Sequence, residues 1–229
     1  MLWNESDVKA NIRNRDGKRV FFLGKGDQLT SSARDYLNRE RIGIVSADQA
    51  KPGRYRLLCG GYLEEKPEHM THLRGDILVS KAHPRIAFRG AMDTLQAELL
   101  LCAGKQPPQT ASQVGEVLAL ARHILSCEVM DESVDFPKLC GLTEAELRQR
   151  SHRPQDYYGQ PHFMPSVEDG EQILLLNRCR CAARNAELKA AEAFCREDGR
   201  CQREDILRAL NRMSSMLYIL MIGLKSGRQ

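Results

Sequence analysis

The sequence predicts a mainly α fold, in which an antiparallel helical bundle follows a small N-terminal α+β unit. Two observations carry this prediction. From Pro84 onward, four long segments and one short one repeat their apolar residues with the period of an α-helix, and modest connections join them. Before that point, short apolar runs alternate with turn residues and one helical segment. The 229 residues are enough for one sizeable core and a small appendage.

The N-terminal unit, residues 1–54, is expected to mix strands with one helix. Thr30 and Ser31 are both candidates for the N-cap of that helix, because a hydroxyl can accept a hydrogen bond from a free amide of the first turn. Short apolar runs on either side of the helix are typical of strands. The predicted elements are a strand at 19–23, a turn at 24–27, a helix at 31–39 and a strand at 42–45.

A linker and an irregular loop are predicted between this unit and the bundle. Pro52 and Gly53 mark residues 48–54 as the linker. Residues 55–80 contain several glycines and show no helical period, which predicts an irregular loop. The exception is a short strand at 77–79.

The bundle domain is predicted over residues 81–229. Pro84 favours a first helical turn, and Gly104 is expected to end that helix. Thr143 and Glu146 have the spacing of a capping box, which predicts the start of the short helix. The predicted elements are helices at 84–103, 111–130, 143–152, 169–198 and 204–224, with a loop at 155–168.

Composition and charge exclude several classes of protein. Hydrophobic residues make up 42% and charged residues 28%, as is ordinary for a globular protein, and a net charge of +4 without a basic run argues against a nucleic-acid partner. No apolar stretch of about 18 residues and no signal-peptide pattern is found, so we expect no membrane association and a cytoplasmic location. The eight cysteines are expected to be reduced, and none has the CxxC spacing of a zinc site.

The predicted helix at 169–198 has two polar stripes where a surface helix needs one. Two arginines one turn apart on the second stripe form a fork for a carboxylate or a phosphate, because a guanidinium keeps its charge when it is partly desolvated. The alternative is that this stripe simply widens the solvent face. The predicted apolar face is Leu175, Cys179, Ala182, Ala186, Ala190 and Ala193, the solvent face is Arg178, Asn185, Lys189 and Glu192, and the second stripe is Asn177, Arg180, Arg184 and Glu187.

Two further helices carry polar groups among apolar ones. Asp93 lies on a stripe with apolar neighbours, where a buried carboxylate needs a partner, and Arg180 and Arg184 are the candidates. Alternatively, Asp93 lies at the edge of the helix. In the last helix, Asn211 begins a polar stripe that is expected to face other polar groups. The stripe either lines a ligand site or makes hydrogen bonds inside the bundle. That stripe is Asn211, Ser215 and Tyr218, opposite Ile206, Leu210, Met213 and Leu217.

The segment KAHPR, residues 81–85, precedes the first long helix. Lys81 and Arg85 flank a helix N-terminus, whose unpaired amides favour an anion such as a polyphosphate. The alternative is that both side chains are simply solvated.

Several of these segments together resemble one family, the corrinoid adenosyltransferases of the ethanolamine-utilisation type, which are related to the propanediol-utilisation type. The motifs with this resemblance extend over nearly the whole chain and occur in the family's order. They are KAHPRIAFRGAMDTLQAELLL at 81–101, LLNRCRCAARNAEL at 175–188, LNRMSSMLYILM at 210–221, SHRP at 151–154, HFMP at 162–165 and the early GDQLTSSARDYL.

The resemblance implies an ATP:cob(I)alamin adenosyltransferase, which transfers the 5′-deoxyadenosyl group of ATP to cob(I)alamin and releases triphosphate. It also implies a five-helix bundle, in which Asp93 pairs with Arg180 as part of the catalytic set that includes Arg184. It places Lys81, Arg85, Glu187 and Asn211 at the ATP, with Mg²⁺. His162 or Phe163 would displace the lower axial ligand of cobalamin.

One departure from the family concerns a metal. Some ethanolamine-type enzymes have a histidine followed by CCxxC that binds a divalent transition metal, whereas this chain has YRLLC and matches only at Cys59. One thiolate cannot supply four ligands, so we predict that this metal is not bound.

The resemblance also implies partners and a location. We expect a homo-oligomer, a dimer or a trimer, with an adenosylcobalamin-dependent lyase and a reductase as partners, in the cytoplasm or inside a bacterial microcompartment. Two other functions stay open at this point. One is a corrinoid carrier that does not catalyse, and the other is an assembly protein of the compartment.

Overall fold

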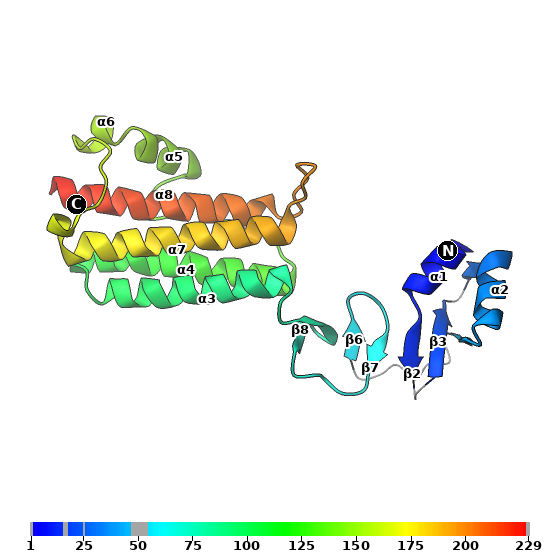
Figure 1. The fold of residues 1–229 in the computed structure, drawn as a ribbon. Helices are drawn as coiled ribbons and strands as arrows, with labels where there is room; N and C mark the ends of the chain where they lie inside the picture. Colours follow the sequence, from blue (N-terminus) through cyan, green and yellow to red (C-terminus); the bar gives the residue numbers. More distant parts are fainter. Residues whose placement is uncertain (1, 16–17, 25, 47–54, 228–229) are drawn as a thin grey trace. The chain divides into compact units, whose positions relative to one another are not determined.

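The computed structural model describes residues 2–15, 18–24, 26–46 and 55–227, and it divides into two compact units. The first is Met1–Val79 and the second is Ser80–Gln229. Figure 1 shows strands and short helices in the first unit and long helices in the second.

The N-terminal part of the first unit confirms the predicted strand, helix, strand order. The hydroxyl of Thr30 accepts from the amide of Ala33 at 3.3 Å, so Thr30 is the N-cap. The sequence prediction missed α1, which a capping box at Asn4 begins, and three short strands. The sheet order is β2-β3-β5, with β5 parallel to β3, and β1 pairs with β4. The elements are β1 Leu2–Trp3, α1 Glu5–Ala10, β2 Arg13–Arg15, β3 Lys18–Leu23, β4 Gln28–Leu29, α2 Ser31–Arg39 and β5 Gly43–Ser46.

Residues 55–80 form a four-stranded sheet, so the prediction of an irregular loop was wrong there. Its order is β7-β6-β9-β8, and β6 pairs antiparallel with β7 and parallel with β9. Each strand is too short to show a period, and the central pairing, β6 with β9, joins the two ends of this segment. The strands are β6 Tyr55–Leu57, β7 Tyr62–Leu63, β8 Met70–Arg74 and β9 Ile77–Ser80. The predicted linker, 48–54, lies outside the described residues.

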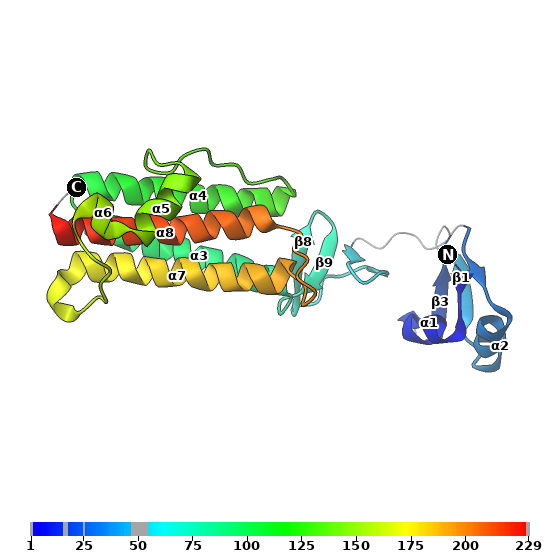
Figure 2. The same ribbon diagram turned by 90° about the horizontal axis from the view of Figure 1, so that it is seen from above.

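The second unit is the predicted antiparallel bundle. In Figures 1 and 2 the four long helices lie side by side, and α5 and α6 pack against α8. One continuous core lies between the helices, with Phe88, Met92, Leu176 and Leu210 among its fully buried side chains. The bounds are α3 Pro84–Ala103, α4 Pro108–Met130, α5 Glu144–His152, α6 Pro154–Tyr158, α7 Gly170–Phe194 and α8 Glu204–Ser226, with a 3₁₀ turn at Val167–Asp169.

The end of α7 differs from its prediction. The helix stops at Phe194 rather than at 198, because Cys195 is extended and forms an isolated β-bridge with Cys201. The two cysteines also form a disulfide that closes the turn before α8, which corrects the expectation that all eight are reduced. Their six-residue separation matches no spacing motif, and only the folding of the turn brings their Cα atoms to 4.0 Å.

Among the described residues, no helix has both the length and the apolar character needed to cross a membrane.

Candidate functional site

A polar seam between α7 and α8 contains four of the nine predicted site residues, namely Arg180, Arg184, Glu187 and Asn211. We define the seam as Asn177, Arg180, Arg184 and Glu187 on α7 with Asn211, Ser215 and Tyr218 on α8. The amide of Asn211 donates to the carboxylate of Glu187 at 3.1 Å, so the two stripes face each other. The second stripe of α7 therefore lies along the contact with α8, with Arg184 exposed at its edge.

The rest of α7 is arranged nearly as predicted. Cys179, Ala186 and Ala190 are buried as expected, whereas Leu175, Ala182 and Ala193 are only half-buried against the core. The fully covered face is rotated toward α8, because the helix must also cover the core on that side. Its buried residues are Ile173, Leu176, Cys179, Ala183, Ala186, Ala190 and Phe194.

The two arginines of the seam have different contacts. The Nε and Nη2 of Arg180 both donate to the Oδ1 of Asn177, at 3.2 and 3.1 Å, and its guanidinium carbon lies 6.0 Å from the centre of the Tyr218 ring. Arg184 is exposed and makes no hydrogen bond or ion pair with any residue in the described part of the chain. The donors of Arg184 are therefore available to an external anion.

On α8, Asn211 is held from both sides. It donates to Glu187, and its own Oδ1 accepts from the neighbouring Arg212. Burial lowers the pKa of Arg212, and its Nε is buried without a hydrogen-bond partner among the described residues. No sequence motif marks Arg212 apart from its position beside Asn211.

His162 and Phe163, in the loop before α7, contact the seam at Tyr218 on α8. The Nδ1 of His162 lies 2.9 Å from the hydroxyl of Tyr218, and the two rings stack with centroids 5.8 Å apart. The ring of Phe163 stacks on the ring of Tyr218 with centroids 6.3 Å apart. The ammonium of Lys225 lies over the ring of Phe163, 5.4 Å from its centre. Tyr218 was predicted to lie on the polar stripe but was not selected as a site residue, although it lies seven residues after Asn211 on the same face.

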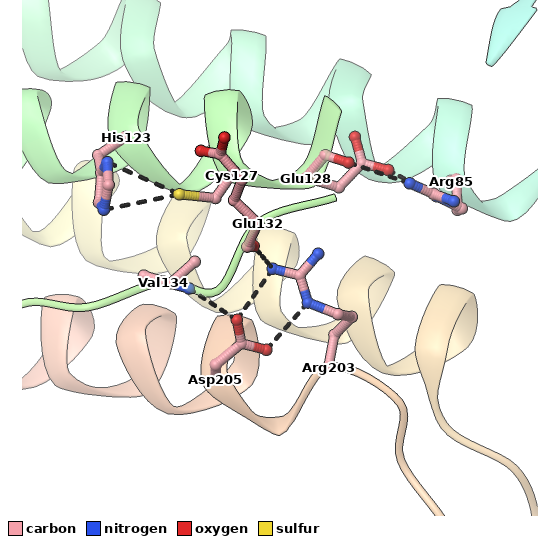
Figure 3. A network of polar contacts seen from close by, with 8 residues as sticks. All are labelled: Arg85, His123, Cys127, Glu128, Glu132, Val134, Arg203 and Asp205. Atoms are coloured by element: carbon pink, nitrogen blue, oxygen red, sulfur yellow. Dashed lines mark hydrogen bonds and ion pairs between the residues drawn. The ribbon is translucent and has the colours of Figure 1, made fainter. Parts of the chain in front are cut away.

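Arg85, predicted at the phosphates, is instead bound to an acid of the bundle. Its Nε donates to the Oε1 of Glu128 at 2.6 Å and its Nη2 to the carbonyl of that residue at 3.1 Å (Figure 3). The Nε of Arg89 donates to the other oxygen of this fully buried carboxylate, also at 2.6 Å. The excess positive charge expected around KAHPR is thus partly neutralised. Lys81 is exposed just before α3.

A second network lies beside Glu128 in Figure 3 and fixes the loop after α4. Asp205, at the start of α8, accepts from the amide of Val134 at 2.8 Å and from the guanidinium of Arg203. Arg203 also donates to the carbonyl of Glu132 at 2.7 Å. These contacts stabilise one end of the bundle and do not reach the seam residues.

The predicted pair of Asp93 with Arg180 does not form within one chain. Arg178 of α7 donates to Glu98 of α3 at 2.7 Å, which shows that α3 lies on the opposite flank of α7 from the seam. Asp93 itself is exposed, so its predicted burial is wrong for the single chain. Its stripe on α3, which includes Gly90 and Ala97, faces away from the core.

The fold and the seam together define the class of protein: a helical bundle in which α7 and α8 share a polar seam, with guanidinium groups along the seam and aromatic rings at one end of it. The chain belongs to the cobalamin adenosyltransferase family, whose profile matches residues 61–224.

Named relatives and solved structures agree with this assignment. The chain is 30% identical to the corrinoid adenosyltransferase EutT of Salmonella typhimurium, over 95% of this chain and 90% of the relative. It is 29% identical to EutT of Escherichia coli, with the same coverage. Two variants of a PduO-type ATP:corrinoid adenosyltransferase from Lactobacillus reuteri, complexed with cobalamin and ATP, share the fold with TM-scores of 0.54 and 0.55 at 17% and 18% identity. Both superpositions cover 73% of this chain, and 95% and 92% of the solved chains.

Proposed function

We propose that this protein is an ATP:cob(I)alamin adenosyltransferase that serves ethanolamine utilisation. Membership of the family supports the reaction class. The observation that carries the proposal in this chain is the seam. There Arg184, which has no hydrogen bond or ion pair among the described residues, lies on one stripe with Arg180, and that stripe faces the stripe of Asn211. The rings of His162, Phe163 and Tyr218, at one end of the same seam, would supply an apolar surface for a second substrate.

The proposed reaction needs no side-chain nucleophile. The electron pair of Co(I) attacks C5′ of ATP, a Co–C bond forms, and the bond from C5′ to oxygen breaks with its electrons moving onto the leaving triphosphate. The protein therefore acts by positioning and by stabilising the charge that develops on the triphosphate. One opposite charge about 4 Å away is worth about 4 kcal/mol near a protein surface before desolvation, which corresponds to several powers of ten in rate.

At the ATP, we assign the phosphate contacts to Arg184 and Lys81. Arg184 has its donors available, whereas Arg180 donates to Asn177 and is better placed to order the stripe. Asn211 and Glu187, which are hydrogen-bonded to each other, are proposed to contact the nucleoside. For Arg85 we propose an indirect role, since Glu128 occupies its Nε and Nη2.

Mg²⁺ is proposed to arrive with ATP. The described residues contain no group of three or more histidine, cysteine or acidic side chains that could hold a metal ion. Mg²⁺ keeps several waters and commonly binds through substrate phosphates rather than through an all-protein cage. Its charge would add to that of Arg184 at the triphosphate.

We further propose that the protein acts as a homo-oligomer, either a dimer or a trimer. The outward stripe of α3 is apolar, with Leu100 and Leu101 exposed by 53% and 63%, and it includes the carboxylate of Asp93. A second copy would cover the apolar residues and provide a countercharge for Asp93. Pairing of Asp93 with Arg180 is then a contact between copies, which would join the catalytic residues across the interface.

The partners of the reaction follow from its chemistry. A reductase must deliver cob(I)alamin, and an adenosylcobalamin-dependent lyase would consume the product. A location in the cytoplasm, free or inside a microcompartment, is part of the same proposal.

An anaerobic assay of ATP with cob(I)alamin tests the function. We expect the absorbance of cob(I)alamin to be replaced by that of adenosylcobalamin, with release of triphosphate, whether or not EDTA has first removed transition metals and Mg²⁺ has then been restored. If the protein binds cobalamin but does not bind ATP, it is a carrier. If it binds neither, it is an assembly component.

A further inference from the structure

The turn between α7 and α8 is closed by the disulfide Cys195–Cys201, which joins residues only six positions apart. The stabilisation that a disulfide gives grows with the length of the loop that it closes, so this one contributes little by that route. The backbone also holds the turn. The two cysteines form a β-bridge, and inside it the amide of Arg196 donates to the carbonyl of Arg200 at 2.8 Å. The stability of the turn therefore does not explain the disulfide.

The same features suit a disulfide that opens and closes. Both cysteines are half-exposed, so an external thiol can reach their sulfur atoms. After reduction the β-bridge would keep the two thiols beside each other, which favours their reoxidation. In the cytoplasmic location proposed above, disulfides are uncommon, and those that occur are usually redox-sensing or catalytic.

The residue before the disulfide connects it with the start of α3. Phe194, the last residue of α7, is buried, and its ring meets the ring of Phe88 edge-on with centroids 5.7 Å apart. The guanidinium carbon of Arg85 lies 5.7 Å from the centre of the ring of Phe194. Arg85 belongs to the first turn of α3 and follows Lys81 by four residues. The disulfide is thus one residue from the side chain that packs against the KAHPR segment.

We propose that Cys195 and Cys201 are a reversible thiol–disulfide site whose oxidation state sets the affinity of the KAHPR segment for ATP. The disulfide fixes the end of α7 and with it the contact of Phe194 with Arg85. Reduction removes this restraint and lets the end of α7 move relative to the start of α3. The regulation rests on the proposed function, in which Lys81 contacts the triphosphate. The thiol–disulfide exchange itself does not depend on that function.

The reductant is a dithiol, either a small molecule or a protein. Its thiolate attacks one cysteine sulfur, and the S–S bond breaks with its electrons moving onto the other sulfur, which takes up a proton. The second thiol of the reductant then attacks the mixed disulfide and releases the remaining cysteine as a thiol. In sum the protein gains two electrons and two protons, and the dithiol becomes a disulfide.

Counting the thiols of the unaltered full chain tests the exchange. One sample is equilibrated with oxidised glutathione and one with dithiothreitol, and each is then unfolded in iodoacetamide. We expect Cys195 and Cys201 to be alkylated only in the second sample, so that at most six of the eight cysteines carry the label in the first and all eight in the second. Peptide masses identify the two positions. The same labelling of both cysteines in the two samples would overturn the proposal.

Calorimetry of ATP binding in the presence of Mg²⁺ and without cobalamin tests the regulation. We expect the Kd for ATP to be about three- to fivefold higher in the reduced chain, less than the factor for full release of one backbone residue. The double variant Cys195→Ser with Cys201→Ser should bind ATP like the reduced chain and should not respond to dithiothreitol. Cys59→Ser removes an exposed thiol of the first unit and should keep the full response.

The outcomes separate this proposal from the proposed function. Equal Kd values for the oxidised and reduced chains, or a response to dithiothreitol that persists in the double serine variant, would contradict the regulation while the adenosyltransferase activity stands. Failure of the oxidised chain to bind ATP and to transfer its adenosyl group to cob(I)alamin would contradict the proposed function, and the regulation with it.

Discussion

Arg180 and Arg184 lie one turn apart on α7, yet their surroundings give them different tasks. Arg180 is half-buried, and its Nε and Nη2 donate to Asn177. Arg184 is exposed, and in the described part of the chain no acid neutralises it. A guanidinium that is already hydrogen-bonded orders its neighbours, whereas one with available donors can bind a ligand.

The substitution Arg184→Ala should therefore abolish most of the activity and leave the fold intact. We expect kcat/KM for ATP to fall by about 10²-fold, the size typical of losing one group that stabilises developing charge. Thermal unfolding should stay close to that of the unaltered chain, because Arg184 is exposed and makes no hydrogen bond or ion pair among the described residues. Arg122→Ala removes another exposed arginine, on α4, and serves as the control. An unchanged rate for Arg184→Ala would exclude its role at the phosphates.

Glu128 shows the opposite case, a carboxylate whose role is structural. It is fully buried, and two arginines that are 23% and 18% exposed donate to it. Glu128→Gln removes the negative charge that both guanidinium groups share, which we expect to lower the free energy of unfolding by about 3 kcal/mol in urea titrations. Glu192→Gln, at an exposed ion pair with Lys189, should cost no more than about 0.5 kcal/mol. Similar values for the two variants would contradict this assignment.

At the scale of the elements, local capping determines where α5 begins. The hydroxyl of Thr143 accepts from the amide of Glu146, and the carboxylate of Glu146 accepts from the amide of Thr143 at 2.8 Å. The sequence pattern predicted this box because all its atoms lie within four residues. The end of α7 could not be predicted in this way, since the extended conformation of Cys195 depends on its pairing with Cys201 across the turn.

The capping box also makes a prediction about pH. The amide and the hydroxyl of Thr143 hold the pKa of Glu146 below its ordinary value. A carboxyl whose pKa is lowered by folding stabilises the native state at neutral pH, and this contribution disappears as the pH falls through the folded-state pKa. The difference in Tm between the unaltered chain and Glu146→Gln should therefore shrink between pH 6 and about pH 3. A difference that stays constant over this interval would refute the assignment.

At the scale of the whole molecule, the outward face of α3 is the feature that one chain does not explain. Its stripe is apolar around Asp93, and Leu100 and Leu101 are more than half exposed. A stripe of this kind on a helix of the main bundle is typical of a surface that another protein covers. The proposed second copy would cover this stripe, and Arg180 of its α7 would supply a countercharge for Asp93.

Leu101→Lys should therefore shift the protein toward the monomer and lower its activity in parallel. Light scattering after size-exclusion chromatography measures the mass, and Leu2→Lys, in the first unit, is a control for an added charge at another exposed leucine. Asp93→Asn and Arg180→Met should show a coupling energy in a double-mutant cycle of oligomer stability. Independent effects of the two changes would exclude their contact, and an unaltered mass for Leu101→Lys would exclude this face as the interface.

The sequence by itself determined the helices of the bundle, the capped starts of α2 and α5, and the polar stripes of α7 and α8. Each depends on residues within a few turns of one another, so the periodicity and the cap motifs contain the necessary information. The order of the motifs also determined the family. The tertiary structure decided which stripe faces which helix: it placed Arg180 beside Tyr218 and not Asp93, tied Arg85 to Glu128, and assembled four short strands from residues 55–80. These outcomes depend on contacts between residues distant in the sequence, whose geometry exists only after the helices have packed and the strands have paired.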